Sequence, residues 1–328
     1  MHKAICYTIT LHLAALTDSI ALAYLRYFIG WASIGIMKHP FLSLCVAILL
    51  SLASAAQAKP LVLSSLKPLT LIAQEITGSS ADVDTLLPST ASHHNYPLKM
   101  SDHARLQKAD VILWVGAELE SFLQKPLANL PSEKIITAYD LANMNWPAES
   151  AEAHEHHHEH DPHLWLDPRN AILVAQALTA KLVQVDAANA AQYRANLALF
   201  VAKATNLDQK LLASLKPLAR EGFAVYHEGF GHFVGRYGLK QLDYVTFTPE
   251  QKPGARHMHQ LREKLAKEGK CLFLEPYNDM QSARALAQEL HLNLGTLDAL
   301  GTQGAATYQR LLEQMAEAFS ACLANRSN

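Results

Sequence analysis

Histidine is the residue type that points first to chemistry, because the 328-residue chain holds 17 of them. Six of these lie within ten positions, in HEHHHEHDPH from His154 to His163. Imidazole nitrogen is a common ligand of Zn²⁺ and of other borderline metals. A metal site is therefore the first chemistry to consider for this chain.

Three histidines stand in a different sequence context from the rest. His94 lies in LLPSTASHHNYPL, just after a predicted strand, and His227 directly follows the apolar run FAVY. His163 lies in HDPHLWLDP, where Pro162 and Trp165 add stiffness and packing. Ligands of open α/β sheets bind beyond the carboxyl ends of the strands. We therefore expect His94 and His227 at the site, with His163 beside them.

Three converging imidazoles favour Zn²⁺, which takes a four-coordinate shell and leaves one place here for water or a carboxylate. Ca²⁺ and Mg²⁺ prefer oxygen ligands and would be poorly served. Carboxylates often orient the ligand rings. Glu228 beside His227, and Asp161 or Asp167 near His163, are the candidates for that role.

Predicted strands and helices alternate along the chain from residue 61 onward. In the first half LVLSSL, ADVDTLL, DVILWVG and KIITAYDL are strands separated by helical segments, and in the second half FAVYHEGF, LDYVTF, CLFLEP and LNLGTLD repeat the pattern. Such alternation predicts an α/β fold of two lobes, each built on a parallel sheet. We expect the metal site of the three histidines to lie in the cleft between the two lobes.

A strongly helical run, rich in Ala, Leu, Lys and Gln, separates the two halves from about residue 170 to 215. A helix of about 28 residues would be about 42 Å long and would span both lobes as a rigid backbone. The expected domains are a first lobe, 59–187, with a His-rich loop at 151–162; a linking helix, 188–216; and a second lobe, 217–328. Two ordinary packed helices in a single domain are the alternative.

The N-terminal segment 1–58 is predicted to be an extension followed by a signal peptide over 37–58. A basic start, an apolar core and the sequence Ala-Gln-Ala at 56–58 are typical of secretory signals. Residues 1–36 are either untranslated, an overlong n-region of the signal peptide or a membrane anchor. Segment 1–58 holds three basic and one acidic side chain, so the net charge of −2 becomes −4 without it. This balance gives no indication of nucleic-acid binding.

Only two cysteines, Cys271 and Cys322, follow the predicted cleavage site. An even number of cysteines in an exported chain predicts a disulfide bond. Two buried free thiols are the alternative.

Several segments together resemble the metal-binding solute receptors of ABC transporters that carry zinc, manganese and iron, and in particular the zinc branch. The resemblance covers nearly all of the chain after residue 58. It is carried by LLPSTASHHNYPLKMSDHARLQKADVILWVGAELESFL, DPHLWLDPRNA, FAVYHEGFGHFVGRYGL, PEQKPGAR, CLFLEP and GTLDALG.

The resemblance implies that His94, His163 and His227 are zinc ligands. A water molecule, Asp298 or His93 would complete the shell. It also implies an accessory histidine segment and is consistent with a disulfide in the second lobe; the accessory residues are His154, His156, His157, His158 and His160.

The same resemblance implies a non-enzymatic monomer in the periplasm that delivers Zn²⁺ to a membrane permease with a cytoplasmic ATPase. Three alternatives stay open. A manganese or iron receptor would use Asp298, and a secreted zinc hydrolase would need a general base such as Glu228. A zinc buffer would work without a transporter.

Overall fold

The computed structural model describes residues 58–88, 91–147, 160–276 and 280–324. Residues 59–328 form one compact unit, separate from residues 1–58. The predicted signal peptide and most of the His-rich loop therefore lie outside the described residues. The elements of the compact unit, in chain order, are β1 (Leu61–Ser64), α3 (Lys67–Thr77), β2 (Asp82–Thr85), α4 (Met100–Lys108), β3 (Val111–Trp114), α5 (Ser121–Ala128), β4 (Ile135–Thr137), η3 (Leu164–Leu166), α6 (Pro168–Val185), α7 (Ala190–Leu215), β5 (Gly222–His227), α8 (Gly231–Tyr237), β6 (Lys240–Thr246), α9 (Ala255–Glu268), β7 (Gly269–Leu274), α10 (Gln281–Glu289), β8 (Asn293–Thr296) and α11 (Tyr308–Ala324).

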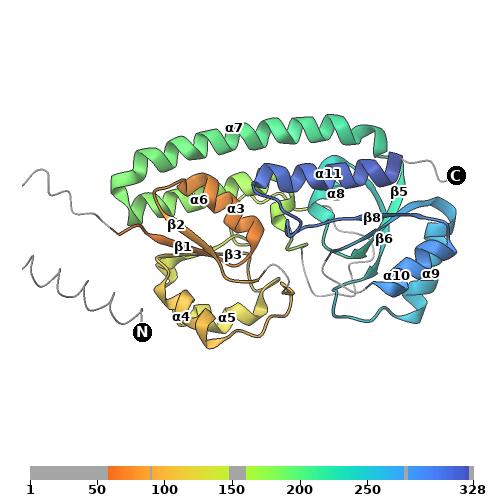
Figure 1. Ribbon diagram of the computed structural model, residues 1–328, viewed down its shortest axis with the longest axis horizontal. Helices are drawn as coiled ribbons and strands as arrows, with labels where there is room; N and C mark the ends of the chain where they lie inside the picture. The colour runs from red at the N-terminus through yellow and green to blue at the C-terminus, as the bar shows by residue number, and fades with distance from the viewer. Residues whose placement is uncertain (1–57, 89–90, 148–159, 277–279, 325–328) are drawn as a thin grey trace, which may run out of the picture. The chain divides into compact units, whose positions relative to one another are not determined.

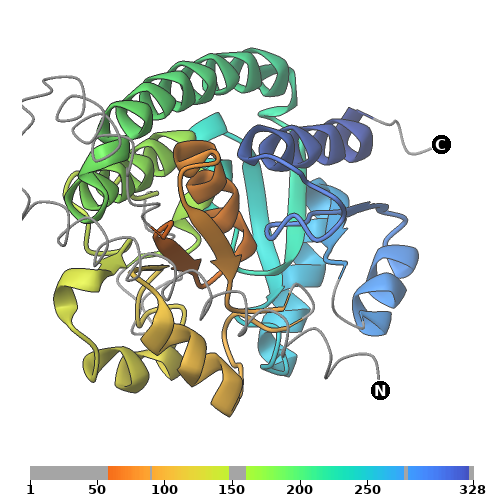
Figure 2. The ribbon, with the colours of Figure 1, turned by 60° about the vertical axis from the view of Figure 1, so that its left-hand side comes forward.

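Two four-stranded parallel sheets form the two lobes. The first has the strand order β2-β1-β3-β4 and the second β6-β5-β7-β8, so both lobes repeat one topology. The central strand β3 is buried at every position, as expected for a strand covered on both faces. Figure 2 shows the strands of the first sheet, in orange, in front of those of the second, in cyan and blue. The predicted α/β fold with two parallel-sheet lobes is confirmed.

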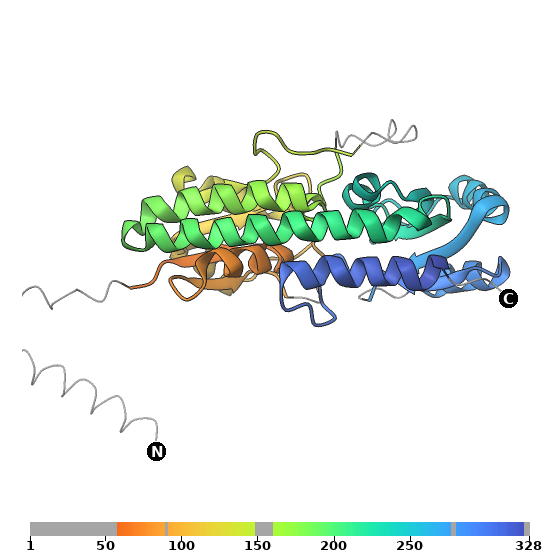
Figure 3. The ribbon, with the colours of Figure 1, turned by 90° about the horizontal axis from the view of Figure 1, so that it is seen from above.

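The long helix α7 runs beside both lobes. It packs against α3 and α6 next to the first sheet and against α8 and α11 next to the second (Figures 1 and 3). At about 1.5 Å per residue, its 26 residues reach about 39 Å. Its buried apolar side chains follow the helical repeat and join a hydrophobic core that continues from one lobe into the other; they are Tyr193, Phe200, Ala204, Leu207, Leu211 and Leu215.

The predicted linking helix, 188–216, thus corresponds closely to α7. The structure adds a break at Asp186, whose carboxylate accepts a hydrogen bond from the Tyr193 hydroxyl at 2.6 Å. This break separates α6 from α7 and lets the two helices pack side by side (Figure 3). The proposed boundaries of the domains stay a prediction. In the part of the chain that the structure describes, no helix has both the length and the apolar character needed to cross a membrane.

A buried carboxyl group, Glu120, lies at the start of α5 in the first lobe. It is fully buried, and its Oε2 accepts a hydrogen bond from the Val115 N–H at 2.8 Å. Burial raises the pKa of Glu120 to about 7, although the nearby Ser65 hydroxyl and backbone N–H groups partly oppose this effect. Because that pKa exceeds the usual value of 4.5, the folded protein holds this proton more tightly than the unfolded chain. The resulting stabilisation is complete below about pH 4.5 and is lost as the pH rises through about 7.

Glu120→Gln keeps an acceptor for Val115 and cannot ionise. We expect the free energy of unfolding of this variant, relative to the wild type, to increase by about 2 kcal/mol between pH 5 and pH 8. Urea denaturation with a metal chelator present measures this difference. Glu133→Gln, at an exposed position, is the control and should show no such trend. Parallel pH profiles of wild type and Glu120→Gln would contradict the prediction.

Candidate metal centre

His93 and His94 lie in the loop that follows β2. The backbone N–H groups of Leu86 and Leu87 still bond to the carbonyls of Ser64 and Ser65, which extends the ladder beyond β2. After the loop, the buried Tyr96 donates its hydroxyl proton to Asp102 in α4 at 3.2 Å. Both ends of the loop are therefore fixed to the first lobe.

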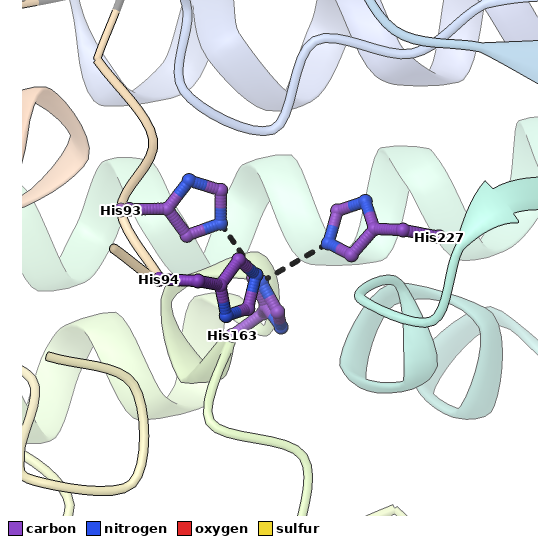
Figure 4. Close-up of side chains that lie close together, drawn as sticks. All are labelled: His93, His94, His163 and His227. Carbon is purple, nitrogen blue, oxygen red and sulfur yellow. Dashed lines mark hydrogen bonds between the residues drawn. The ribbon is translucent and has the colours of Figure 1, made fainter. Parts of the chain in front are cut away.

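A local turn directs these two neighbouring rings. The Ser92 hydroxyl oxygen accepts hydrogen bonds from the backbone N–H groups of His94, at 3.2 Å, and Asn95, at 3.3 Å. The tight turn brings the ring centroids of His93 and His94 to 4.3 Å from each other. As a result, two consecutive residues contribute to the same site (Figure 4).

His163 precedes the short helical turn η3, which is anchored by Trp165. This tryptophan is fully buried and donates from Nε1 to the Ala299 carbonyl at 2.8 Å. Asp161 Oδ1 accepts from the His163 backbone N–H at 3.0 Å and lies 2.7 Å from its Nδ1. One carboxylate oxygen therefore holds both the backbone and the ring of His163, and the ring presents Nε2 to the site.

His227 is the last residue of β5 and is fully buried. Its Nδ1 lies 2.6 Å from Oε1 of Glu275, which directly follows the neighbouring strand β7. The sequence analysis expected Glu228 to hold this ring, but the Glu228 carboxylate accepts from the Gln241 amide at 2.7 Å instead. The prediction failed because successive side chains along an extended strand point to opposite faces, whereas adjacent parallel strands place Glu275 beside His227.

The four rings bring their nitrogen atoms together at one point. Ligand atoms of His93, His94, His163 and His227 all lie within 4.8 Å of one another. His163 Nε2 is 3.2 Å from His93 Nε2 and 3.4 Å from His227 Nε2 (Figure 4). Bonds of 2.0–2.1 Å in a tetrahedral zinc shell place neighbouring nitrogens about 3.3–3.4 Å apart. The two separations at His163 Nε2 match this spacing, and all four ligand atoms lie close enough together to hold one metal ion.

Proton placement in His163 and His227 also indicates a cation site. In the neutral rings each Nδ1 carries the proton, since it faces the carboxylate of Asp161 or Glu275. Each Nε2 atom then carries a lone pair and no proton, and the two Nε2 atoms face each other at a distance of 3.4 Å. While both rings are neutral the two lone pairs repel, and the repulsion is removed either by a metal ion bound between them or by a proton on one Nε2, which then donates to the other.

Gly229 keeps space open at the cluster. A Cβ atom at this position would lie 2.9 Å from His163 Cε1 and closer still to His227 Nε2. Any larger residue would therefore displace the rings.

Burial controls the charge of the rings. Desolvation, reinforced by the neighbouring imidazoles, holds the pKa of His93 well below its usual value of 6.5. Burial also lowers the pKa of His163 and outweighs the opposing effect of Asp161. Burial also lowers the pKa of His227, but the nearby carboxylates, chiefly that of Glu275, together have the larger effect, so the pKa of His227 is raised above 6.5. His93 and His163 are therefore neutral at pH 7, which is the form that binds metals.

The structure thus brings together the three histidines predicted as ligands and His93, one of the candidates for the fourth place. Asp298, the other candidate for the fourth place, is not in the cluster; its Oδ2 accepts from Gln303 N–H at 2.7 Å and from the Thr302 hydroxyl at 3.0 Å. Asp167 caps α6 and pairs with Arg169 at 2.5 Å rather than holding His163.

Only His160 of the predicted accessory residues is described, and its ring stacks on Trp146 with centroids 4.6 Å apart. His154, His156, His157 and His158 lie outside the described residues. The predicted disulfide is confirmed: Cys271 in β7 is joined to Cys322 in α11. It ties the C-terminal helix to the strand that ends beside Glu275.

Two parallel-sheet lobes beside a long helix, with a histidine cluster between the lobes, are the architecture of two-lobed metal-binding receptors. A solved ZnuA structure aligns with a TM-score of 0.70 and 25% identity, and the match covers 81% of this chain and 99% of that chain. A mutant Mn-bound periplasmic metal binding protein from Candidatus Liberibacter asiaticus aligns with the same TM-score and identity, and covers 81% and 100%.

Sequence comparison gives the family. The ZnuA family, described as zinc-uptake complex component A, periplasmic, matches residues 62–322. The high-affinity zinc uptake system protein ZnuA of Yersinia pestis is 31% identical over 299 residues, which cover 83% of this chain and 92% of that protein. The protein of the same name from Haemophilus ducreyi is 30% identical and covers 80% and 93%. The chain belongs to the ZnuA family.

The contact between His227 and Glu275 gives a test of the centre. We expect Glu275→Gln to weaken Zn²⁺ binding about 10- to 100-fold, because the ring loses the carboxylate that fixes its tautomer and increases its basicity. Competition with a chromophoric chelator measures the dissociation constant. Glu228→Gln removes a carboxylate one residue from His227 that does not hold the ring, and it should leave the affinity nearly unchanged. A larger loss in Glu228→Gln than in Glu275→Gln would contradict this assignment.

Proposed function

We propose that this protein is a zinc receptor that captures Zn²⁺ in the periplasm and delivers it to an ABC permease for import. The observation that carries the proposal is the pair of buried Nε2 atoms of His163 and His227, 3.4 Å apart, each opposite an Nδ1 held by a carboxylate. Membership of the ZnuA family supports the same conclusion, since the relatives in Yersinia pestis and Haemophilus ducreyi are named zinc uptake proteins.

The donor set favours zinc over manganese. Nitrogen ligands suit Zn²⁺, whereas carboxylate, carbonyl and water oxygen suit Mn²⁺. We assign His93, His94, His163 and His227 as the four ligands, with His93 in the place considered for Asp298 or water. A shell of four imidazoles contains no oxygen, so the manganese or iron alternative is less well supported.

The same four ligands argue against the zinc hydrolase. A catalytic zinc site keeps one position for the water that reacts, whereas a site with four protein ligands is closed. Glu228, the candidate general base, is engaged by the Gln241 amide. We therefore propose binding and transport without catalysis.

The cellular setting is part of the proposal. Segment 37–58 has the pattern of a signal peptide, and the family description names the periplasm. The partners would be a membrane permease and its cytoplasmic ATPase, and the receptor would act as a monomer. The accessory histidines, His154 to His160, would bind Zn²⁺ more weakly than the cluster because consecutive imidazoles on a loop lack a preformed geometry.

Competitive titration of the purified protein with Zn²⁺ and Mn²⁺ tests the binding step. We expect one tight zinc site that disappears in the triple variant His94→Ala/His163→Ala/His227→Ala and survives deletion of residues 154–159. His93→Ala should weaken zinc binding, since it leaves three imidazoles, and Asp298→Asn should change it little. His259→Ala, with a largely exposed ring on α9, is the control. Loss of the tight site with the loop deletion, or preference for Mn²⁺, would refute the proposal.

Delivery is tested in cells that lack their own high-affinity zinc uptake. Expression of this chain together with its permease and ATPase should restore growth under zinc limitation, whereas the chain alone should not. The triple histidine variant, exported to the same level, should fail with the permease present. Restoration by the wild-type chain without the permease would indicate a zinc buffer rather than a transport receptor.

A further inference from the structure

We infer that His232 is a positioning residue for the metal centre, which acts through Asp161 on the ligand His163 without contacting the metal. The inference rests on the proposed function, since it assigns a task within the same site. His232 lies in the first turn of α8, is 1% exposed and is not one of the four clustered histidines.

Hydrogen bonds fix the tautomer of His232. The Asn170 side-chain oxygen accepts from Asn145, from its backbone N–H at 2.8 Å and its amide at 3.1 Å. The Asn170 amide nitrogen therefore supplies the donors, to the Asn145 carbonyl at 3.0 Å and to His232 Nδ1 at 3.2 Å. Because Nδ1 accepts, the ring proton lies on Nε2. From there it is donated to the Asp161 carbonyl oxygen at 2.8 Å.

Asp161 needs this support because it lies outside regular secondary structure. Residues 160–163 belong to no helix or strand, so no ladder of backbone bonds fixes them. The His232 side chain holds the Asp161 carbonyl, while Asp161 Oδ1 holds the His163 backbone and ring. A continuous chain of hydrogen bonds thus leads from Asn145 through Asn170, His232 and Asp161 to His163.

Close packing makes the position of Asp161 sensitive to α8. A Cβ atom on Gly231 would lie 2.8 Å from Asp161 Oδ2, so the carboxylate sits directly against the helix backbone. A shift of Asp161 would tilt the His163 ring, and His163 Nε2 would leave its position 3.2 Å and 3.4 Å from the facing nitrogens. Partners of this kind typically change metal affinity about 10- to 100-fold.

The alternative role for His232 is packing alone, because its ring also lies against Trp146, with centroids 5.7 Å apart. His232→Phe separates the two roles, since it keeps an aromatic ring and removes both hydrogen bonds. His232→Gln is the conservative variant, whose amide can still donate to the Asp161 carbonyl. His257→Phe is the matched control: His257 Nε2 lies 2.8 Å from the Tyr244 carbonyl, and its ring packs on Tyr244, but it is not part of the cluster.

The experiment measures the zinc dissociation constant by chelator competition, the visible spectrum of the Co²⁺-loaded protein, and the unfolding of the metal-free protein. We expect His232→Phe to fold, to bind zinc about 10-fold more weakly and to change the Co²⁺ spectrum. His232→Gln should recover most of the affinity, and His257→Phe should resemble the wild type. If His232→Phe does not fold, a Co²⁺ spectrum of His232→Gln identical to that of the wild type supports the inference and an altered one overturns it.

A double variant tests the route through Asp161. If His232 acts through Asp161, His232→Phe combined with Asp161→Ala should weaken zinc binding no more than Asp161→Ala alone. Additive losses, an unchanged affinity in His232→Phe or an equal loss in His257→Phe would overturn the inference. Each of these results leaves the proposed function intact. If the wild-type protein had no tight zinc site, the proposed function and the inference about His232 would both be refuted.

Discussion

Repulsion between imidazole lone pairs is the constraint on which this structure depends. Four histidine side chains from three separate segments direct their nitrogens to a point where all ligand atoms lie within 4.8 Å. Without a cation, such an arrangement is unfavourable, so the protein must hold the rings in place by other means. The carboxylates of Asp161 and Glu275 do so at Nδ1, and the buried surroundings keep water from competing. Gly229 completes the arrangement, because only a hydrogen atom fits between the rings.

The fold supplies the positions that this constraint requires. Both sheets have the same strand order: the second strand of each lobe lies on one side of the first strand, and the third and fourth strands lie on the other side. His227 and Glu275 lie at the carboxyl ends of the two strands at this switch point in the second sheet, where open α/β sheets bind their ligands. Since α7 packs on both lobes and shares a core with them, the loops that carry the other rings are held against a stiff frame.

The sequence was informative where a local pattern decides the structure. Alternating strands and helices predicted the two sheets, and the Ala- and Leu-rich run predicted α7 to within two residues at each end. His94 and His227 were found because each follows a predicted strand, and His163 because Pro162 and Trp165 flank it. Glu275 was missed, although it is the acidic residue at the end of an apolar strand, because strand order decides which ring it meets. Likewise, the choice between His93 and Asp298 depends on the path of two loops, and no local pattern encodes that path.

A cargo site must release its metal, and the contacts between the lobes bear on how this occurs. The Ser92 hydroxyl, next to His93, donates to Glu250 of the second lobe, and Lys67 Nζ donates to the Gly301 carbonyl at 2.5 Å. Exposed polar contacts such as the one between Ser92 and Glu250 contribute little free energy to the association of the two lobes, because water competes for both partners. If the four histidines hold the metal as proposed, the bonds from His93 and His94 would dominate the attachment of this loop to the second lobe. A displacement of the loop would then remove two of the four proposed ligands at once, while α7 stays packed on both lobes.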